Sequence, residues 1–228
     1  MVPRLARKIL IVGHRANTWR IIEWYLRIRP DIIEVDARYM NDRFYAIHGP
    51  SPVRRASIPG KIMAWIDYHF FYRDPILKPI PLENILKRIN GVVDVMIDIK
   101  QRGIASKLGE FLEKTGYTGK VYITSELHPE LKIVKKYIPG AITIASINIL
   151  PVNIVDLVIA ANADMASLHL SLVDREIIDK LHSHGITVLV WTINDKTQAH
   201  KYIEMGVDGI VTDRPDLIKS VVNNLVDE

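Results

Sequence analysis

The chain has 228 residues and contains no cysteine. Disulfides and thiolate-bound metals are therefore excluded, and any metal would be held by oxygen or nitrogen ligands. The sequence also lacks a long apolar run, because the run from Ile9 to Val12 behind the basic start is too short for a membrane span or a signal-peptide core. We expect a cytoplasmic protein without a transmembrane segment.

The chain has little surplus of charge, with a formal net charge of +4. Its lysines and arginines are scattered and form no basic stripe, so nucleic acid is not an expected partner. Hydrophobic residues make up 48% and charged residues 25%, which is typical of a folded globular chain. Because no long repeat, linker or low-complexity segment is visible, we expect residues 1–228 to form a single domain.

Eight short runs rich in β-branched residues alternate with amphipathic helical patterns. One such pattern places Leu82, Ile85, Leu86 and Ile89 on one helix face. Strands that are apolar on both faces and alternate with helices predict an α/β fold with a parallel sheet. Eight such units favour a closed (β/α)₈ TIM barrel, with a doubly wound open sheet as the alternative. The predicted strands are Lys8–Val12, Ile32–Asp36, Val93–Ile99, Val121–Thr124, Ile142–Ala145, Met165–Leu170, Thr187–Trp191 and Gly209–Val211.

The connection between the second strand and the second helix is longer than the others. Residues 49–81 are rich in proline and carry an aromatic cluster between Trp65 and Tyr72. So long a connection is unusual in a compact domain. We therefore interpret residues 49–81 as an insertion within the barrel domain that forms a small lid or subdomain.

Polar residues of reactive types follow three of the predicted strands. In a TIM barrel the carboxyl ends of the strands form the active-site face, so these side chains are expected to converge. Glu34 and Asp36 are two residues apart, as are Asp98 and Lys100, which places both members of each pair on one face of a strand. Carboxylates this close repel one another, and oxygen ligands favour Mg²⁺ or Ca²⁺, with Mn²⁺ as a further option.

Two histidines flank these carboxylates, His14 after the first strand and His48 after the second. Imidazole groups can give and take protons near neutral pH. Arg15 and Lys100 are suited to hold phosphate oxygens. Together these residues favour phosphoryl chemistry on a small-molecule phosphodiester, because a purely structural ion-pair cluster would not need both histidines and three strands.

The same residues resemble, in order, the pattern of the glycerophosphodiester phosphodiesterase family, a phosphatidylinositol-phospholipase-C-like phosphodiesterase barrel. That pattern begins with His-Arg and Glu-x-Asp, and it ends with Trp-Thr-x-Asn and Gly-x-Asp-Gly-x-x-Thr-Asp-x-Pro. The single pieces are unspecific, but the ordered set is specific and spans nearly the whole chain. The matching residues are His14-Arg15, Glu34-Val35-Asp36, His48, Asp98-Ile99-Lys100, Trp191-Thr192-Ile193-Asn194 and Gly206 to Pro215.

The resemblance implies a metal-dependent enzyme that hydrolyses glycerophosphodiesters to an alcohol and glycerol phosphate. It implies Glu34, Asp36 and Asp98 as metal ligands. It also implies His14 and His48 as general acid and base, without deciding which histidine takes which role. The implied substrate contacts are Arg15, Lys100, Asn17 and Trp191, the last as a wall of the pocket.

The chain departs from the family pattern near this site. The first loop is shortened, Ala16 replaces the usual glycine, Gly49 replaces the usual aspartate after the second histidine, and Asp98 replaces a commoner glutamate. Two other functions stay open: a lysophospholipase D-like activity on acylated substrates, and binding of phosphate esters without turnover. A homo-oligomer is also left open.

Three other polar residues are interpreted as structural. Asp213, shortly before Pro215, is typical of the start of a helix, so we assign it to the N-terminal region of the last helix. His169 and Ser125 end predicted strands, and we expect ordinary hydrogen bonds there.

Overall fold

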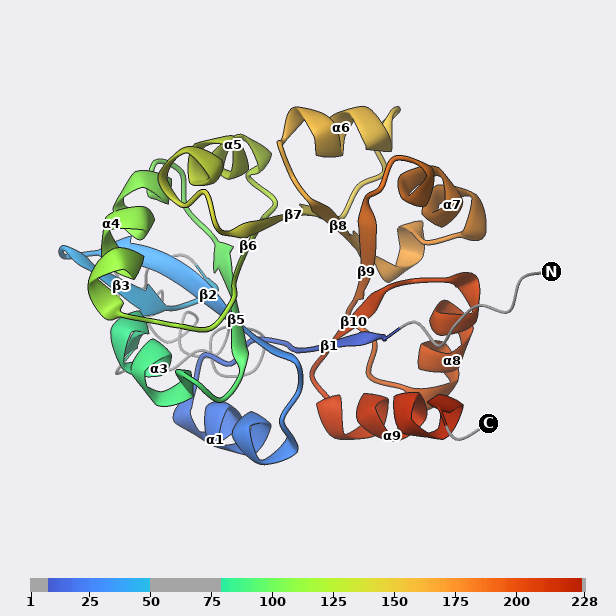
Figure 1. Cartoon of the computed structure of the whole chain (residues 1–228), viewed down its shortest axis with the longest axis horizontal. Coiled ribbons are helices and arrows are strands. Elements are labelled where there is room, and N and C mark those ends of the chain that lie inside the picture. The colour runs from blue at the N-terminus through green and yellow to red at the C-terminus, as the bar shows by residue number, and fades with distance from the viewer. Residues whose placement is uncertain (1–7, 50–78, 227–228) are drawn as a thin grey trace, which may run out of the picture.

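The computed structural model describes residues 8–49 and 79–226, in which eight parallel strands close into a barrel (Figure 1). The barrel strands are β1 (Leu10–Gly13), β2 (Ile32–Met40), β5 (Asp94–Ile99), β6 (Val121–Ser125), β7 (Ile142–Ile147), β8 (Met165–His169), β9 (Thr187–Trp191) and β10 (Gly209–Thr212). They follow one another around the ring in chain order, and β1 closes the ring by pairing with both β10 and β2. This closure excludes the open sheet and confirms the predicted (β/α)₈ barrel.

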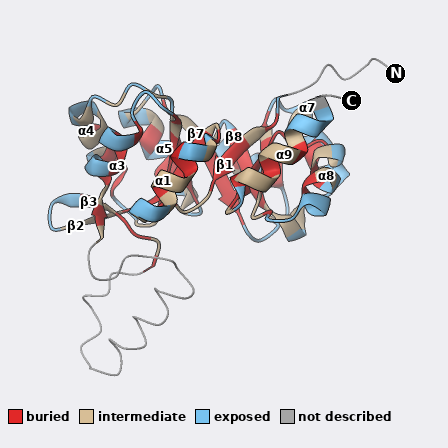
Figure 2. Ribbon diagram, turned by 90° about the horizontal axis from the view of Figure 1, so that it is seen from below, coloured by how far each residue is buried: buried red, intermediate tan, exposed pale blue. Residues whose placement is uncertain are grey.

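Helices surround the ring, and one follows each barrel strand (Figure 1). They are α1 (Trp19–Ile28), α3 (Leu82–Ile89), α4 (Ala105–Thr115), α5 (His128–Tyr137), α6 (Ile154–Ala160), α7 (Arg175–Ser183), α8 (Lys196–Met205) and α9 (Pro215–Val226), and a short 3₁₀ helix, η3 (Leu170–Leu172), precedes α7. In α3 all four residues of the predicted stripe are buried. Exposed residues lie mainly on the outward sides of the helices (Figure 2). None of the described helices is long and apolar enough to cross a membrane.

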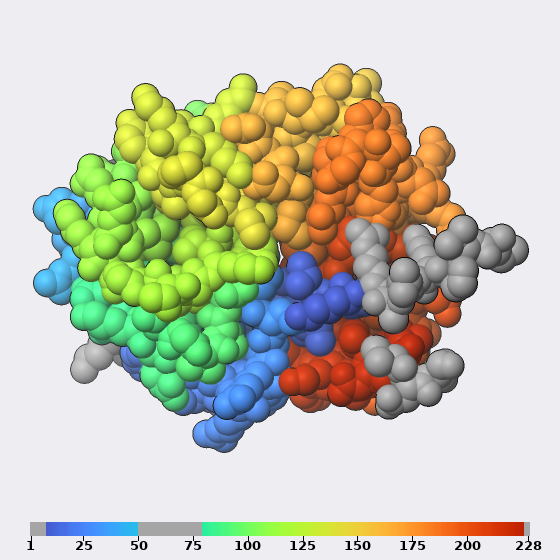
Figure 3. Space-filling view, viewed as in Figure 1, coloured from blue at the N-terminus to red at the C-terminus, as the bar shows by residue number. Residues whose placement is uncertain are grey.

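The first and last described segments of the chain lie side by side. Strand β1 pairs with β10, and α1 contacts α9. In the space-filling view the blue and red atoms of these segments adjoin (Figure 3). Residues near the two ends of the sequence can therefore meet at one place on the barrel.

Two layers of apolar side chains form the core. Inside the barrel each strand contributes one side chain to an inner layer, and a larger layer fills the space between strands and helices. Because side chains alternate across a strand, the residue two positions further on also faces the interior, closer to the carboxyl end. The inner layer comprises Val12, Ile32, Met96, Tyr122, Ile144, Met165, Leu189 and Val211.

Strand β2 is longer than predicted. The prediction ended it at Asp36, but it continues to Met40 and forms an antiparallel hairpin with β3 (Arg43–Ala46). Asn41 and Asp42 make the turn with φ angles of 48° and 59°. Two-residue hairpin turns need such positive angles, which asparagine and aspartate tolerate. The prediction missed the hairpin because it did not use this turn signal.

The predicted insertion at 49–81 lies largely outside the described residues, since residues 50–78 are not among them. Its end is described: strand β4 (Ile80–Pro81) pairs antiparallel with β3. The end of the insertion therefore returns to the edge of the same sheet before α3 begins.

Gly13, at the end of β1, packs against an aromatic ring. Tyr25 of α1 is 1% exposed, and a Cβ atom at residue 13 would lie 2.7 Å from its Cδ2 atom. The Tyr25 hydroxyl donates a 2.8 Å hydrogen bond to the carbonyl of His14. Because Gly13 has no side chain, α1 can approach β1 and hold the backbone from which His14 projects.

We expect Gly13→Ala to destabilise the protein by about 1–3 kcal/mol, because the added methyl group would displace Tyr25 in a filled core. Gly140→Ala is the matched control, since a Cβ atom there would meet no atom within 4 Å. Urea unfolding of both variants measures the difference. Equal midpoints would show that the close packing at Gly13 does not contribute to stability.

Candidate active site

A layer of mostly polar residues follows the inner apolar layer toward the carboxyl ends of the strands. Each residue comes two positions after an inner-layer residue, so strand periodicity directs it to the barrel interior. The layer consists of His14, Glu34, Asp98, Thr124, Ser146, Ser167, Trp191 and Asp213. Asp36 on β2 comes two residues after Glu34, and Lys100, directly after the end of β5, comes two residues after Asp98.

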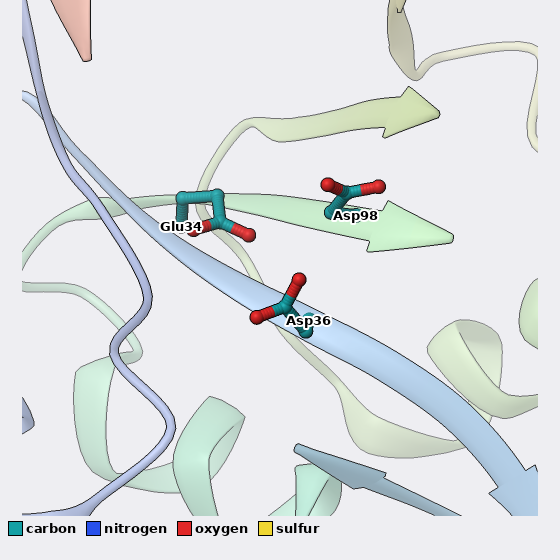
Figure 4. Close-up of side chains that lie close together, drawn as sticks. All are labelled: Glu34, Asp36 and Asp98. Carbon is teal, nitrogen blue, oxygen red and sulfur yellow. The ribbon is translucent and has the colours of Figure 1, made fainter. Parts of the chain in front are cut away.

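The carboxylates of Glu34, Asp36 and Asp98 converge beside β2 and β5 (Figure 4). One oxygen of each lies within 4.8 Å of the others, and the three residues are only 3%, 1% and 9% exposed. The parallel register pairs Asp36 directly with Asp98. Glu34 Oε1 and Asp98 Oδ1 are buried without a hydrogen-bond partner among the described residues. Such an oxygen-rich, donor-poor cluster fits a divalent cation.

Burial and mutual repulsion shift the pKa values of these carboxyl groups. Burial raises the pKa of Glu34 well above its ordinary value, and the charges of Asp36 and Asp98 raise it further. Burial also raises the pKa of Asp98, against the opposing charge of Lys100. At Asp36 burial acts upward too, but Lys100 and other groups outweigh it, so that pKa is lowered. A bound cation would let all three groups ionise together.

Lys100 lies at the edge of the carboxylate cluster. Its Nζ donates to Asp98 Oδ2 at 2.5 Å and lies 3.3 Å from Asp36 Oδ1. Burial alone would lower the pKa of this ammonium group, but the carboxylates raise it above its ordinary value, so Lys100 is charged at neutral pH. Because its side chain is 18% exposed, Lys100 is also accessible to an anionic ligand.

Arg15 links the first loop to His48. Its backbone N donates to Glu34 Oε2 at 2.6 Å, and its Nη2 donates to His48 Nε2 at 3.0 Å. A guanidinium group only donates, so this nitrogen of His48 is an acceptor. Burial lowers the pKa of His48 to about 4, despite the opposing charge of Asp36. The His48 ring is therefore neutral at neutral pH.

Arg38 is a site residue that the sequence analysis missed. Its Nε and Nη2 donate to the carbonyl of His48 at 3.3 and 3.0 Å. Arg38 comes two residues after Asp36 on the extended β2, so the two residues share a strand face. The prediction missed Arg38 because it ended the strand at Asp36. Only a strand that continues past Asp36 indicates which way the Arg38 side chain points.

His14 Nδ1 donates to Asp213 Oδ1 at 3.0 Å across the seam between β1 and β10. The assignment of Asp213 to a helix start agrees with α9, which begins at Pro215, but it missed this contact. Strand periodicity could have revealed the contact. Asp213 comes two residues after Val211 of the inner layer, just as His14 comes two residues after Val12.

Asn17 and Trp191, the other predicted substrate contacts, occupy different places. Asn17 is 1% exposed, its Nδ2 donates to Asp36 Oδ2 at 2.7 Å, and its Oδ1 accepts from the Asp36 backbone N at 3.1 Å. It therefore supports a carboxylate of the cluster.

Trp191 ends β9, where its Nε1 donates to the Ser167 carbonyl at 3.0 Å. Its ring meets that of His169 edge-on, with 5.1 Å between the ring centroids. This pair forms an aromatic wall at the barrel mouth.

The fold and the site together define a TIM-barrel protein with a buried acidic centre suited to a divalent cation. Residues 80–217 match the model of the glycerophosphoryl diester phosphodiesterase family. This span is more than half of the chain, so the chain belongs to that family and is a phosphoric diester hydrolase. The predicted resemblance is thereby confirmed. The span includes Asp98, Lys100 and Trp191, whereas His14, Glu34, Asp36 and His48 precede it.

Relatives resemble the chain over nearly its whole length. YhdW of Bacillus subtilis (strain 168), provisionally named a glycerophosphodiester phosphodiesterase, is 25% identical over 91% of this chain and 96% of its own. The glycerophosphodiester phosphodiesterase of Bacillus altitudinis is 26% identical, over 88% and 89%. An Oleispira antarctica phosphodiesterase, solved with the product sn-glycerol-3-phosphate, has the same fold with a TM-score of 0.77 and 15% identity, over 95% and 97% of the two chains.

We expect Mg²⁺, Mn²⁺ or Ca²⁺, added back after chelation, to raise the thermal midpoint of the protein. A cation that binds only the folded cluster stabilises it by about 2.7 kcal/mol at a concentration 100 times its Kd. Glu34→Gln should abolish most of this rise. It should also leave the metal-free protein at least as stable as the wild type, because it removes one of three mutually repelling buried carboxylates.

Glu83→Gln is the control for this measurement. Glu83 is an exposed carboxylate of α3 that pairs with Lys87, so its removal should leave the metal-induced rise unchanged. Differential scanning fluorimetry of the three proteins, with and without metal, gives the comparison. A full metal-induced rise in Glu34→Gln would contradict the assignment of the cation to this cluster.

Proposed function

We propose that the protein hydrolyses glycerophosphodiesters in a metal-dependent reaction that releases an alcohol and glycerol phosphate. The observation that carries the proposal is the convergence of three buried carboxylates, two histidines, Arg15 and Lys100 at one barrel mouth. Membership of the family supports the reaction class. The sn-glycerol-3-phosphate bound to the Oleispira antarctica phosphodiesterase is a product of the proposed kind.

Glu34, Asp36 and Asp98 are the proposed ligands of a divalent cation, which would polarise the phosphate oxygens when bound. Mg²⁺ and Ca²⁺ suit these ligands, with Mn²⁺ as a further option. Lys100 and Arg15 are proposed to bind the remaining phosphate oxygens by charge-assisted hydrogen bonds. These two side chains and Arg38 match the three carboxylates in charge. A divalent cation would outweigh the further negative charge of Asp213, so the site would have surplus positive charge that favours a phosphodiester anion.

His14 and His48 are proposed to exchange protons with the reacting oxygens. One histidine takes a proton from the nucleophile, and the other gives a proton to the departing alcohol. Water as the nucleophile gives glycerol phosphate directly, whereas attack by the neighbouring glycerol hydroxyl gives a cyclic phosphate that water then opens. Burial lowers the pKa of His48 to about 4, so this ring starts neutral. Trp191 is proposed to form the wall against which the substrate lies.

A lysophospholipase D-like activity is the second candidate, because an apolar surface lies at the barrel mouth. The loop after β7 exposes Ile149, Leu150 and Val152 by 78%, 50% and 107%. No charged residue occurs from 139 to 155. An acyl chain on a substrate held at the carboxylate cluster would find an uncharged neighbour in this loop.

The test is hydrolysis of glycerophosphocholine, glycerophosphoethanolamine and lysophosphatidylcholine by chelated enzyme to which metal is returned. We expect metal-dependent release of glycerol phosphate from the two water-soluble diesters. His14→Ala and His48→Ala should each lower kcat by roughly 10²- to 10⁴-fold, because each removes one proton-transfer group. Initial rates measured over a range of substrate concentrations give kcat and KM.

The matched control is His184→Ala, which removes an exposed histidine after the end of α7 and should keep the wild-type kcat. Faster turnover of lysophosphatidylcholine than of the soluble diesters would replace the first candidate by the second. Metal-dependent binding without turnover of any of the three compounds would contradict both.

A further inference from the structure

Asn194 and Asp213 belong to the two closing motifs of the sequence, and the reaction described above uses neither. Asn194 Nδ2 donates to Asp213 Oδ2 at 2.9 Å. Asn194 Oδ1 accepts from the Asp213 backbone N at 2.8 Å and from Thr212 Oγ1 at 3.1 Å. Both ends of the Asn194 carboxamide are therefore engaged, and a flip of the group would break all three bonds.

The loop that carries Asn194 is itself anchored to β10. Ile193 is fully buried, and its backbone N donates to the Val211 carbonyl at 3.1 Å. Thr212 is fully buried as well, and its Oγ1 accepts from the Arg214 backbone N at 2.8 Å. The position of Asn194 relative to the end of β10 is therefore fixed by packing and by the main chain.

The second carboxylate oxygen of Asp213 contacts His14. Oδ1 accepts from His14 Nδ1 at 3.0 Å, and the two side chains are only 18% and 16% exposed, so water screens the contact little. The backbone N of His14 also donates to the Thr212 carbonyl at 2.8 Å. The ends of the three neighbouring strands β9, β10 and β1 are thus joined by one chain of hydrogen bonds from Asn194 through Asp213 to His14.

We propose that Asp213 and Asn194 are positioning residues that hold the His14 ring in one orientation and one tautomer for the function proposed above, on which this inference rests. A carboxylate can only accept, so Asp213 keeps a proton on Nδ1 and leaves Nε2 as the nitrogen for the substrate. Asn194 acts through Asp213, because its bond to Oδ2 directs Oδ1 toward His14. The motif that ends in Asn194 and the motif that contains Asp213 then have the same role, which is to position His14.

A purely structural role for Asp213 makes a different prediction. Asparagine is as favourable as aspartate at the N-terminal end of a helix, so Asp213→Asn would be nearly neutral if the residue only served the start of α9. In the positioning role the same substitution is disruptive. The new amide would keep its oxygen toward Asn194 Nδ2 and turn its NH₂ group toward His14 Nδ1, which would then have to accept.

The first measurement is the tautomer of His14, read from long-range ¹H–¹⁵N spectra of the full chain labelled with ¹⁵N-histidine. The His14 signals are those that His14→Ala lacks. We expect a proton on Nδ1 in the wild type and a shift of the proton to Nε2 in Asp213→Asn. This readout does not depend on turnover, so it separates a failure of the positioning role from a failure of the proposed function.

The second measurement is the kinetics of glycerophosphocholine hydrolysis. Asp213→Asn is expected to lower kcat by roughly 10²- to 10⁴-fold with little change in KM, because the residues proposed to bind phosphate are kept. Asn194→Ala should lower kcat less, since Asp213 remains beside His14. In a His14→Ala background Asp213→Asn should have almost no further effect, because the group that it positions is gone.

Asp216→Asn is the matched control. It removes a carboxylate in the first turn of the same helix that pairs with Arg214, and it should change neither kcat nor the His14 tautomer. A wild-type kcat and a retained Nδ1 proton in Asp213→Asn would overturn the proposal. The proposal would also be overturned if Asp213→Asn lowered kcat as much in the His14→Ala background as in the wild type. Asp213 would then act independently of the histidine.

Discussion

A strand in a closed parallel barrel turns only every second side chain toward the interior, and this constraint decides which residues meet at the mouth. Val12 and Ile32 fill the inner layer, and His14 and Glu34 follow them by two positions. Val35, between two carboxylates, instead packs in the outer layer against the helices. The apolar ring therefore sets the height and direction of the reactive groups above it.

The barrel also contains buried carboxylates, which oppose folding. Three buried carboxylates lose hydration and repel one another. At Glu34, burial and then the charges of Asp36 and Asp98 raise the pKa well above its ordinary value. Lys100 offsets part of this cost by an ion pair with Asp98. Arg15 offers Glu34 a backbone N–H. A bound cation would offset the remaining cost, so ion binding would be linked to the stability of the whole barrel.

The parts of the site that could be predicted from the sequence are those whose signal is local. Two-residue spacing places Glu34 with Asp36 and Asp98 with Lys100, and alternation of strands and helices is enough to predict the barrel. The pairing of His14 with Asp213 joins residues 199 positions apart, and only closure of the ring brings them together. The position of Asp213 just before the last helix was a sufficient reason for its presence, so the prediction did not include its contact with His14.

The short loop between β1 and α1, residues 14–18, serves the acidic cluster as well as the histidine that it carries. Its Arg15 backbone N–H bonds Glu34, and its Asn17 side chain bonds Asp36 at two points. A change of length or shape in this loop would therefore move two of the three carboxylates at once. The loop after β7 carries exposed apolar side chains and none of these residues. Changes in the loop after β7 would therefore leave these contacts of the carboxylates in place, so the two sides of the barrel mouth can change independently of each other.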